Sequence, residues 1–593
     1  MPNKLSQFWQ ELKRRNVTRV LAVYIAAAFM LLELISMISD PFGLPEGTLK
    51  VAFIISLAGL VITVIVSWVY DIHPEGGIVK TDPNLIAQSE EIPKFSSNWK
   101  IASYISFVVI FALIILNIIP RVENKKANLD KSIAVLPFVS LSDDPEKQYL
   151  ADGVMDEVLL HLSMIKDLRV ISRTSVEQYR DTKKTVSDIC QELNVAYLLE
   201  GSFQKFGDQV RLIVQLLEPG KEGHLWAKNY DRNWKDIFSV QSEIAQLVAN
   251  ELHAVITPEE KKRIDEIPTE DLNAYEYYLL GRNRLNSHVE DADSWRAIDY
   301  FQQAINIDPA FALAYSALAD AYYQLIIGAL LSPGEAYPKV SEYSQKALEL
   351  NEELAYTHCL LGIVKLSYEY DYSGAEKEFM RALEIDPKSV EAHTYYARLH
   401  FLFHRTDEAI VHIDRALELD PQFFWLKLIK SELHFSADSI NEAIRLLEEL
   451  RNSYPYIPAI YWISAVFYTH LGRYEEALSM LDTQLALMGD DNISDEIGLQ
   501  GFIYGRLDLK DEALKQQARL DELSLKGYYV SPRTRVWIYL GLDNLDEAFA
   551  VLEKAYNDHS IDPVSFILYF YPIESLQSDP RFKDYLQKIG LNN

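Results

Sequence analysis

A 34-residue repeat in the carboxyl half constrains the fold of this chain more than any other feature. Alanine opens the second helix of successive units at this constant interval, at Ala375, Ala409, Ala443 and Ala477. One helical hairpin of this size cannot bury its own apolar face, so successive hairpins have to stack and share a continuous core. The carboxyl half is therefore predicted to be a helical solenoid, with a concave face lined by the first helix of each unit.

Small residues and prolines mark where the helices of this array cross and where they end. Small residues recur on the first helices, at Gly281, Ala319, Gly362, Ala397, Ser431 and Ala465. Proline stops a helix, and Asp-Pro pairs end units at Asp308-Pro309, Asp386-Pro387 and Asp420-Pro421. The stretch "HLGRYEEAL" closely resembles the tetratricopeptide consensus, and residues 272–562 resemble an array of about eight such units. Residues 563–593, with "SLQSDPRFKDYLQKIGL", resemble the segment that ends such arrays and are predicted to form a C-terminal cap.

The repeat register places a set of aromatic and arginine side chains on the concave face. Exposed aromatic residues and arginine contribute much of the binding energy of protein interfaces. We therefore predict a groove for a protein or peptide partner, and the alternative is that stacked neighbours cover some of these side chains. The predicted partner-binding residues are Tyr323, Arg398, Phe401, Trp425, Phe435 and Trp462.

Three apolar segments near the amino end, residues 20–39, 51–70 and 101–119, each have the length of a membrane-spanning helix. Arg14 and Arg15 precede the first segment, so the positive-inside rule predicts a cytoplasmic amino end over residues 1–19. Three crossings within 20–119 would then place everything after a linker at 120–131 in the periplasm, although Arg121 argues the other way. Glu33 lies inside the first segment and is interpreted as an interfacial or helix-facing carboxylate rather than part of an ion path.

Residues 132–255 alternate between strand and helix patterns and are predicted to form an α/β domain. A loop with Ser140, Ser142, Asp143 and Asp144 joins its first strand to its first helix, which is a common place for a phosphate or a metal. However, no glycine-rich phosphate loop is present, and these residue types are also those that a turn and a helix N-cap require. The loop is therefore predicted to be a structural corner.

This region also resembles a known domain family. The strings "SIAVLPFVSLSDDPEKQYLADGVMDEVLLHLSMIKDLRVISRTS" and "LNVAYLLEGSFQKFGDQVRLIVQLLEPGKEGHLWAKNYDR" resemble the TolB amino-terminal-like domain of bacterial membrane proteins. The resemblance implies a domain that follows a membrane anchor and precedes tetratricopeptide repeats. Relatives often carry a nucleotide-cyclase or winged-helix domain ahead of the membrane, and this sequence shows neither. The activity of those cyclase or winged-helix domains is therefore not expected of this chain.

Charge and chemistry exclude several functional classes. Residues 131–593 hold 45 Lys and Arg against 75 Asp and Glu, which disfavours nucleic-acid binding and suits a basic partner. The spacing of His393, His400 and His404 places them on one helical face, but two occupy packing positions, so no metal site and no cofactor are predicted. Cys190 and Cys359 form no zinc or redox pattern.

These observations predict a multidomain chain with an α-helical membrane anchor, an α/β sandwich-type domain and an all-α tetratricopeptide solenoid. The predicted function is that of a non-enzymatic scaffold or signalling adaptor in the bacterial inner membrane, able to associate with itself as a homo-oligomer. The alternative is a transmembrane sensor whose α/β domain binds a small ligand and relays a signal through the membrane helices. No catalytic residue is predicted.

Overall fold

The computed structural model describes residues 131–591 apart from short gaps at 143, 145–146, 221–223, 288–290, 489–493, 561 and 571–572. It also describes two short strands and isolated positions between residues 24 and 80. The chain divides into two compact units, residues 1–126 and residues 127–593, which are considered separately.

In the first unit, the described strands form one antiparallel hairpin. β1 (Tyr70–His73) pairs with β2 (Gly77–Lys80), so Tyr70, which the sequence suggested as the end of a membrane span, begins a strand instead. No helix among the described residues is long and apolar enough to cross a membrane. This finding contradicts the predicted fold class with its helical anchor over 20–119, and the inner-membrane location and topology that depended on it. Most of the three apolar segments, including Glu33, lie outside the described residues.

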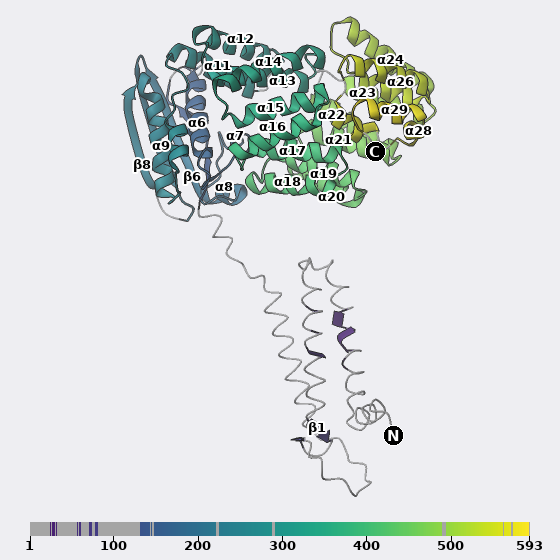
Figure 1. Ribbon diagram of the computed structural model, residues 1–593, viewed down its shortest axis with the longest axis horizontal. Helices are drawn as coiled ribbons and strands as arrows, with labels where there is room; N and C mark the ends of the chain where they lie inside the picture. The colour runs from purple at the N-terminus through teal and green to yellow at the C-terminus, as the bar shows by residue number, and fades with distance from the viewer. Residues whose placement is uncertain are drawn as a thin grey trace. The chain divides into compact units, whose positions relative to one another are not determined.

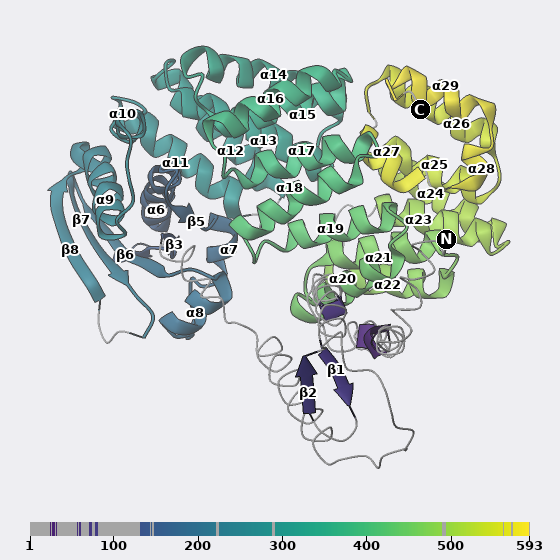
Figure 2. The same cartoon turned by 60° about the horizontal axis from the view of Figure 1, so that its bottom comes forward.

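The second unit (Figure 1) contains a small mixed sheet in the strand order β5-β3-β6-β7-β8, with β4 paired to β6, and Figure 2 labels the five strands of this order. β3 lies parallel to β5 and β6, whereas β6, β7 and β8 form an antiparallel meander. Alternating apolar residues on β7 face the core, as the period of a half-buried strand requires. The strands are β3 (Ser132–Val135), β4 (Val139–Ser140), β5 (Arg169–Val170), β6 (Tyr197–Phe206), β7 (Gln209–Leu217) and β8 (His224–Asn233).

Helices cover the two faces of this sheet unequally. α6 (Gln148–Ser163) and α9 (Ile237–Glu251) pack on one face and share an apolar core with Leu212 and Val214 of β7. The short helices α7 (Arg173–Glu177) and α8 (Val186–Leu193) pack against β3 on the other face, in a separate small core. The turn η2 (Trp234–Asp236) and helix α10 (Pro258–Ile264) complete this part of the unit.

The rest of the unit is a helical solenoid, in which each first helix packs on the second helix that follows it (Figures 1 and 2). The structure is therefore mostly a helical repeat array with a small sheet region. The paired helices are α11 (Leu272–Ser287) and α12 (Asp291–Ile307), α13 (Ala312–Ile327) and α14 (Pro333–Leu350), α15 (Ala355–Val364) and α16 (Tyr372–Ile385), α17 (Val390–Leu402) and α18 (Thr406–Leu419), α19 (Phe424–Ser436) and α20 (Ile440–Ser453), α21 (Pro458–His470) and α22 (Tyr474–Met488), α23 (Ser494–Arg506) and α24 (Lys510–Leu525), α25 (Pro532–Gly541) and α26 (Leu545–Asn557).

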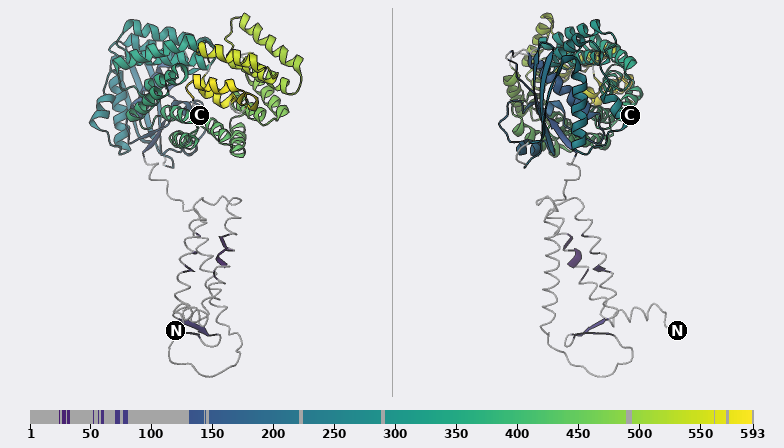
Figure 3. Two further views of the ribbon diagram at one scale, coloured as in Figure 1. Left: turned by 45° about the vertical axis from the view of Figure 1, so that its right-hand side comes forward. Right: turned by 90° about the vertical axis from the view of Figure 1, so that its left-hand side faces the viewer.

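The first hairpin of the array shares its core with the sheet region. Gly153 on α6 leaves no room for a Cβ, because Leu279 of α11 lies directly against it. The ring of Tyr275 on α11 lies 4.6 Å from that of Phe238 and 6.1 Å from that of Trp234, measured between centroids. The sheet region and the array therefore share one continuous apolar core at this point. Figure 3 shows the ribbons of these two parts side by side.

The end of the array returns to its middle. After α26 come α27 (Pro563–Phe570), α28 (Glu574–Gln577) and α29 (Pro580–Lys588), and α27 packs on α17 (Figure 2). A π-helical turn, η3 (Lys365–Glu369), receives this segment: the Tyr368 carbonyl lies 2.6 Å from Nδ1 of His559. The Tyr372 hydroxyl also donates to the carbonyl of Ile589. The array therefore closes on itself through contacts between residues about 200 positions apart.

Candidate partner-binding face

The inner face of the array is built by first helices that approach their second helices closely. Gly281 of α11 lies against the Phe301 ring of α12, and Gly362 of α15 lies in the same way against Phe379 of α16. A side chain at either glycine would overlap the ring, so the small residues detected in the sequence set the distance between the helices.

Three of the predicted groove residues lie deep on this face. The side chains of Tyr323 and Phe401 are only 7% and 5% exposed, and Arg398 is half-buried between them and α19. Arg398 and Phe401 line a pocket of about 370 Å³, a volume that includes open solvent at its mouth. The pocket is lined by Arg398, Phe401, Ile429, Glu432, Leu433, Val564, Ser565 and Leu568.

Helix α27 of the same chain supplies one wall of this pocket. Its N-cap residue Asp562 accepts a hydrogen bond from the backbone N–H of Ser565 at 2.8 Å. The other carboxylate oxygen of Asp562 accepts a hydrogen bond from the Ser367 hydroxyl of η3 at 2.7 Å. One carboxylate thus caps the start of α27 and attaches the helix to the π-helical turn. The deep part of the inner face is therefore occupied by the chain itself.

The pocket brings the guanidinium of Arg398 and the carboxyl group of Glu432 near each other among buried side chains. Burial raises the pKa of Glu432 to about 7, and the nearby guanidinium of Arg398 opposes this shift. Burial also raises the pKa of the Tyr323 hydroxyl, which Arg398 partly offsets. The arginine therefore faces both an acid and a phenol.

The other three predicted residues lie farther along the array. Phe435 of α19 is half-buried and stacks on Phe467, with ring centroids 4.0 Å apart. Trp462 of α21 is half-buried against the core. Trp425, in the first turn of α19, is 44% exposed and touches the ring of Phe424 at a centroid distance of 5.0 Å. Among the six predicted residues, Trp425 presents the largest exposed fraction of its side chain.

The histidines make a packed cluster rather than a ligand set. His393 and His412 share a hydrogen bond between their Nδ1 atoms at 2.9 Å, and His400 stacks on His412 at a centroid distance of 5.4 Å. His404 is not in this cluster: it ends the helical turn with a positive φ of 56°. Burial lowers the pKa of His412 to about 4. No group of metal-binding side chains occurs in the described part of the chain.

The opening corner of the sheet region is held by its own hydroxyl groups. The Ser142 N–H donates to the Ser140 hydroxyl oxygen, and the Asp144 N–H donates to the Ser142 hydroxyl oxygen, both at 3.3 Å. The Ser140 N–H donates to the side-chain oxygen of Gln148 on α6. These bonds use the polar side chains to shape a turn into α6. Asp143 lies outside the described residues.

The sequence analysis missed a second contact between the sheet region and the array. Buried Asp420, in the Asp-Pro turn before α19, accepts hydrogen bonds from the hydroxyls of Ser172 and Ser175, the latter at 2.5 Å. In the preceding Asp-Pro turn, the ammonium of Lys388 donates to the Leu168 carbonyl at 2.6 Å. The side-chain amide of Gln422 donates to the Glu192 carbonyl at 2.6 Å. Two turns of the array thus hold α7 and α8 in place.

Comparisons with known proteins match two parts of the chain. Residues 129–247 match the family model described as HilA/YgeH-like transcriptional regulator, second domain, and residues 367–429 match a tetratricopeptide repeat model. The prediction of tetratricopeptide repeats is therefore confirmed. The resemblance of the sheet region to TolB is not shown, because the matching model is that of the HilA/YgeH-like regulators.

Two curated relatives and one solved structure illustrate the similarity. The chain is 34% identical over 188 residues to "Putative adenylate cyclase 3" of Rhizobium meliloti, which covers 32% of each chain. It is 23% identical over 361 residues to transcriptional regulator HilA of Salmonella typhimurium, covering 58% of this chain and 61% of that protein. The chain thus spans less than two thirds of either relative. Yeast Tom70 is similar over 59% of this chain and 82% of its own, with 14% identity and a TM-score of 0.36.

Proposed function

We propose that this protein is a non-enzymatic scaffold or signalling adaptor that holds a protein partner on the inner face of its repeat array. Tetratricopeptide repeats generally mediate protein–protein interaction, which supports the role of the array. In this proposal, residues 132–255 form a TolB-like support, residues 272–562 the array and residues 563–593 the cap. The relative named as a cyclase does not decide whether the chain has an activity of its own, since only about a third of that relative is matched.

The exposed indole of Trp425 carries this proposal. A large aromatic ring left open at the start of a first helix offers apolar contact area with little side-chain entropy to lose. The turn just before it is fixed to the sheet region, because Gln422 bonds to α8 and also accepts a hydrogen bond from the Tyr454 hydroxyl at 3.0 Å. The ring is therefore presented from a rigid site, and a rigid site loses less entropy when a partner binds.

The charge of the chain indicates the class of partner. The formal net charge is −29, and the acidic excess lies in the second unit. We therefore propose a basic peptide segment with an apolar side chain that packs on Trp425. The buried groove residues Tyr323 and Phe401 would support the shape of this face, while Arg398, Phe435 and Trp462 would contribute through their exposed edges.

A matched pair of tryptophan variants tests the proposal. Trp425 is 44% exposed on a first helix and Trp295 is 43% exposed on the second helix α12, so either truncation removes a similar surface. We expect Trp425→Ala to lose proteins that the wild-type chain captures from an extract of its source cell, by about tenfold or more. Trp295→Ala should retain them. Equal capture by both variants, measured by quantitative mass spectrometry, would contradict the proposed face.

A further inference from the structure

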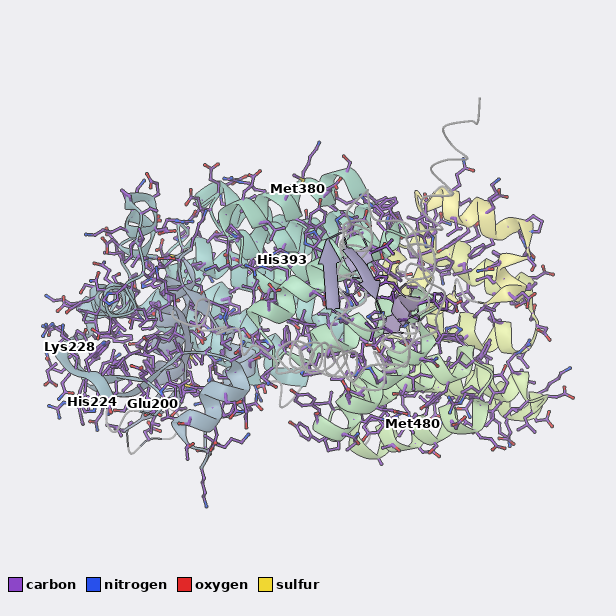
Figure 4. The ribbon with its side chains drawn as sticks, turned by 90° about the horizontal axis from the view of Figure 1, so that it is seen from below. Glu200, His224, Lys228, Met380, His393 and Met480 are labelled. Carbon is purple, nitrogen blue, oxygen red and sulfur yellow. The ribbon has the colours of Figure 1, made fainter. Side chains whose placement is uncertain are left out.

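The outer edge of β8 is a long strand edge with which no described strand pairs. β8 runs over His224–Asn233 and is the last strand of the sheet, and no strand in the described part of the chain pairs with its far side. Figure 4 shows Lys228 and His224 at the margin of the second unit. A free edge of this length presents a row of unsatisfied N–H and C=O groups, which is a template for pairing with another strand.

The hydrogen bonding to β7 identifies the residues whose backbone points outward. Trp234 N–H donates to the Asp208 carbonyl at 2.7 Å, which makes these two residues a hydrogen-bonded pair of the antiparallel ladder. Bonded and non-bonded pairs alternate along such a ladder. Ala227, Asn229 and Asp231 are therefore at non-bonded positions towards β7, and their N–H and C=O groups point to the free side.

The protections of the β8 edge are few. A register shift against Leu216 and Leu217 leaves Leu225 without a partner on β7, and the exposed guanidinium of Arg232 donates to the Asp231 carbonyl at 3.1 Å. Its ten residues contain no proline. A lysine often blocks such an edge, but Lys228 is turned to α9, where its ammonium pairs with Glu243 and lies 5.0 Å from the ring centroid of Tyr230. Asp231 is likewise held within the protomer by Arg211 of β7, whose Nε donates to it at 2.7 Å.

We propose that a second copy of this chain pairs with β8 in antiparallel fashion, with the two-fold axis at Asn229. This register places Asn229 opposite itself and Ala227 opposite Asp231 of the other copy. On the α9 side it places Lys228 opposite a tyrosine and Trp226 opposite Arg232, where the cation can lie on the indole face. No like charges face each other, and the pairing extends from residue 226 to residue 232 in both copies.

The neighbouring registers are less favourable. An axis at Lys228 places this lysine opposite its own copy. An axis at Tyr230 places Lys228 opposite Arg232 of the other copy. An axis at Asp231 sets two aspartates opposite each other. Like charges directly opposite on a strand pair are destabilising. An axis at Ala227 avoids these clashes but leaves residues 231–233 without partners, so the register at Asn229 satisfies the most backbone groups.

A cross-linking experiment on the full chain tests both the pairing and its register. Directly opposed residues of a bonded pair have Cα atoms about 5.5 Å apart, which lies within the range of a disulfide. Asn229→Cys should therefore form a covalent dimer under mild oxidation. Asp231→Cys is the matched control, because four residues of offset separate the two copies of that position by about 14 Å. The two native cysteines are buried, which limits background coupling.

Charge substitutions at Ala227 give an independent readout. In the proposed register Ala227 faces Asp231 of the other copy, and its side chain is exposed, so the fold of the protomer does not depend on it. Ala227→Asp should weaken self-association, and Ala227→Lys should strengthen it, each by about threefold to tenfold in the dimer dissociation constant measured by sedimentation.

The cross-linking and sedimentation results together decide whether β8 pairs in this register. Cross-linking of Asn229→Cys but not of Asp231→Cys, with opposite effects of the two Ala227 variants, supports the pairing. Equal cross-linking of both cysteine variants, no cross-linking of Asn229→Cys, or the same effect from both charges would overturn it. Capture of a partner through Trp425 is a separate measurement on the array, so failure of one proposal leaves the other intact.

Discussion

Replacing Asp420 by alanine is expected to loosen α7 and α8 from the array. The carboxylate is fully buried and accepts hydrogen bonds from two serine hydroxyls of the sheet region, as well as from the backbone of its own turn. Hydrogen bonds to a charged group contribute about 1.5–3 kcal/mol each, and the two serines are left without their acceptor. Loss of the two bonds should therefore cost about 3 kcal/mol or more.

The equivalent aspartate of the preceding repeat provides the control. Asp386 occupies the same place in its Asp-Pro turn, but among the described residues its carboxylate accepts a hydrogen bond only from the N–H of Lys388, at 2.9 Å. Asp386→Ala should therefore cost only about 1 kcal/mol, as for the loss of a cap. The difference between the variants, about 2 kcal/mol, isolates the bonds to Ser172 and Ser175.

Hydrogen exchange measures this difference where it arises. In Asp420→Ala, the amides of α7 should exchange roughly 30-fold faster than in Asp386→Ala, since each 1.4 kcal/mol is a factor of ten. The thermal midpoint should also be lower for Asp420→Ala. Equal exchange of α7 in the two variants would refute the reasoning, because the contact between the turns and α7 would then contribute nothing to its protection.

Four further outcomes are expected. Trp462→Ala should lower the free energy of unfolding by about 2 kcal/mol, because the ring packs on the core, and urea denaturation followed by circular dichroism checks this. Gly362→Val should cost about 3 kcal/mol by the same measurement, since the new side chain overlaps Phe379. Burial lowers the pKa of His412 from 6.5 to about 4, so its contribution to stability is present above pH 6.5 and is lost as the pH falls towards 4; His412→Gln should flatten the drop in thermal midpoint between pH 7 and 5. Glu432 has the opposite shift, from 4.5 to about 7, so stability is lost as the pH rises through this window, and Glu432→Gln should raise the midpoint at pH 8.

The repeats could be predicted from the sequence because they are local. An alanine every 34 residues and a small residue on each first helix follow from the packing of one helix on its neighbour, and Gly281 against Phe301 shows this packing directly. The strands of the sheet region could also be predicted from the sequence, because Gly207 marks the turn between β6 and β7 and takes the positive φ that this turn needs.

Long-range contacts could not be predicted in this way. Nothing in the repeat pattern indicates that Asp420 would meet two serines about 250 positions earlier in the chain, or that α27 would lie on α17. The same limit applies to the groove. Periodicity places Tyr323 and Trp425 on the same face, but the packing of neighbouring helices, such as Tyr395 of α17 against Tyr323, decides that one is buried and the other is open. The prediction of a membrane anchor was also wrong, because the apolar length of a segment does not by itself establish a spanning helix.

The return of the carboxyl end to η3 has a consequence for synthesis on the ribosome. An open stack of repeats can complete each hairpin as soon as it emerges, because each contacts only its neighbours. Here the hydroxyls of Ser367 and Tyr372 obtain their partners from Asp562 and Ile589, which are made about 200 residues later. The middle of the array therefore remains incompletely bonded until residues 562–589 have been synthesised. Loss of residues 562–589 would leave the middle repeats in that nascent state, so a truncation before Asp562 should destabilise the centre of the array.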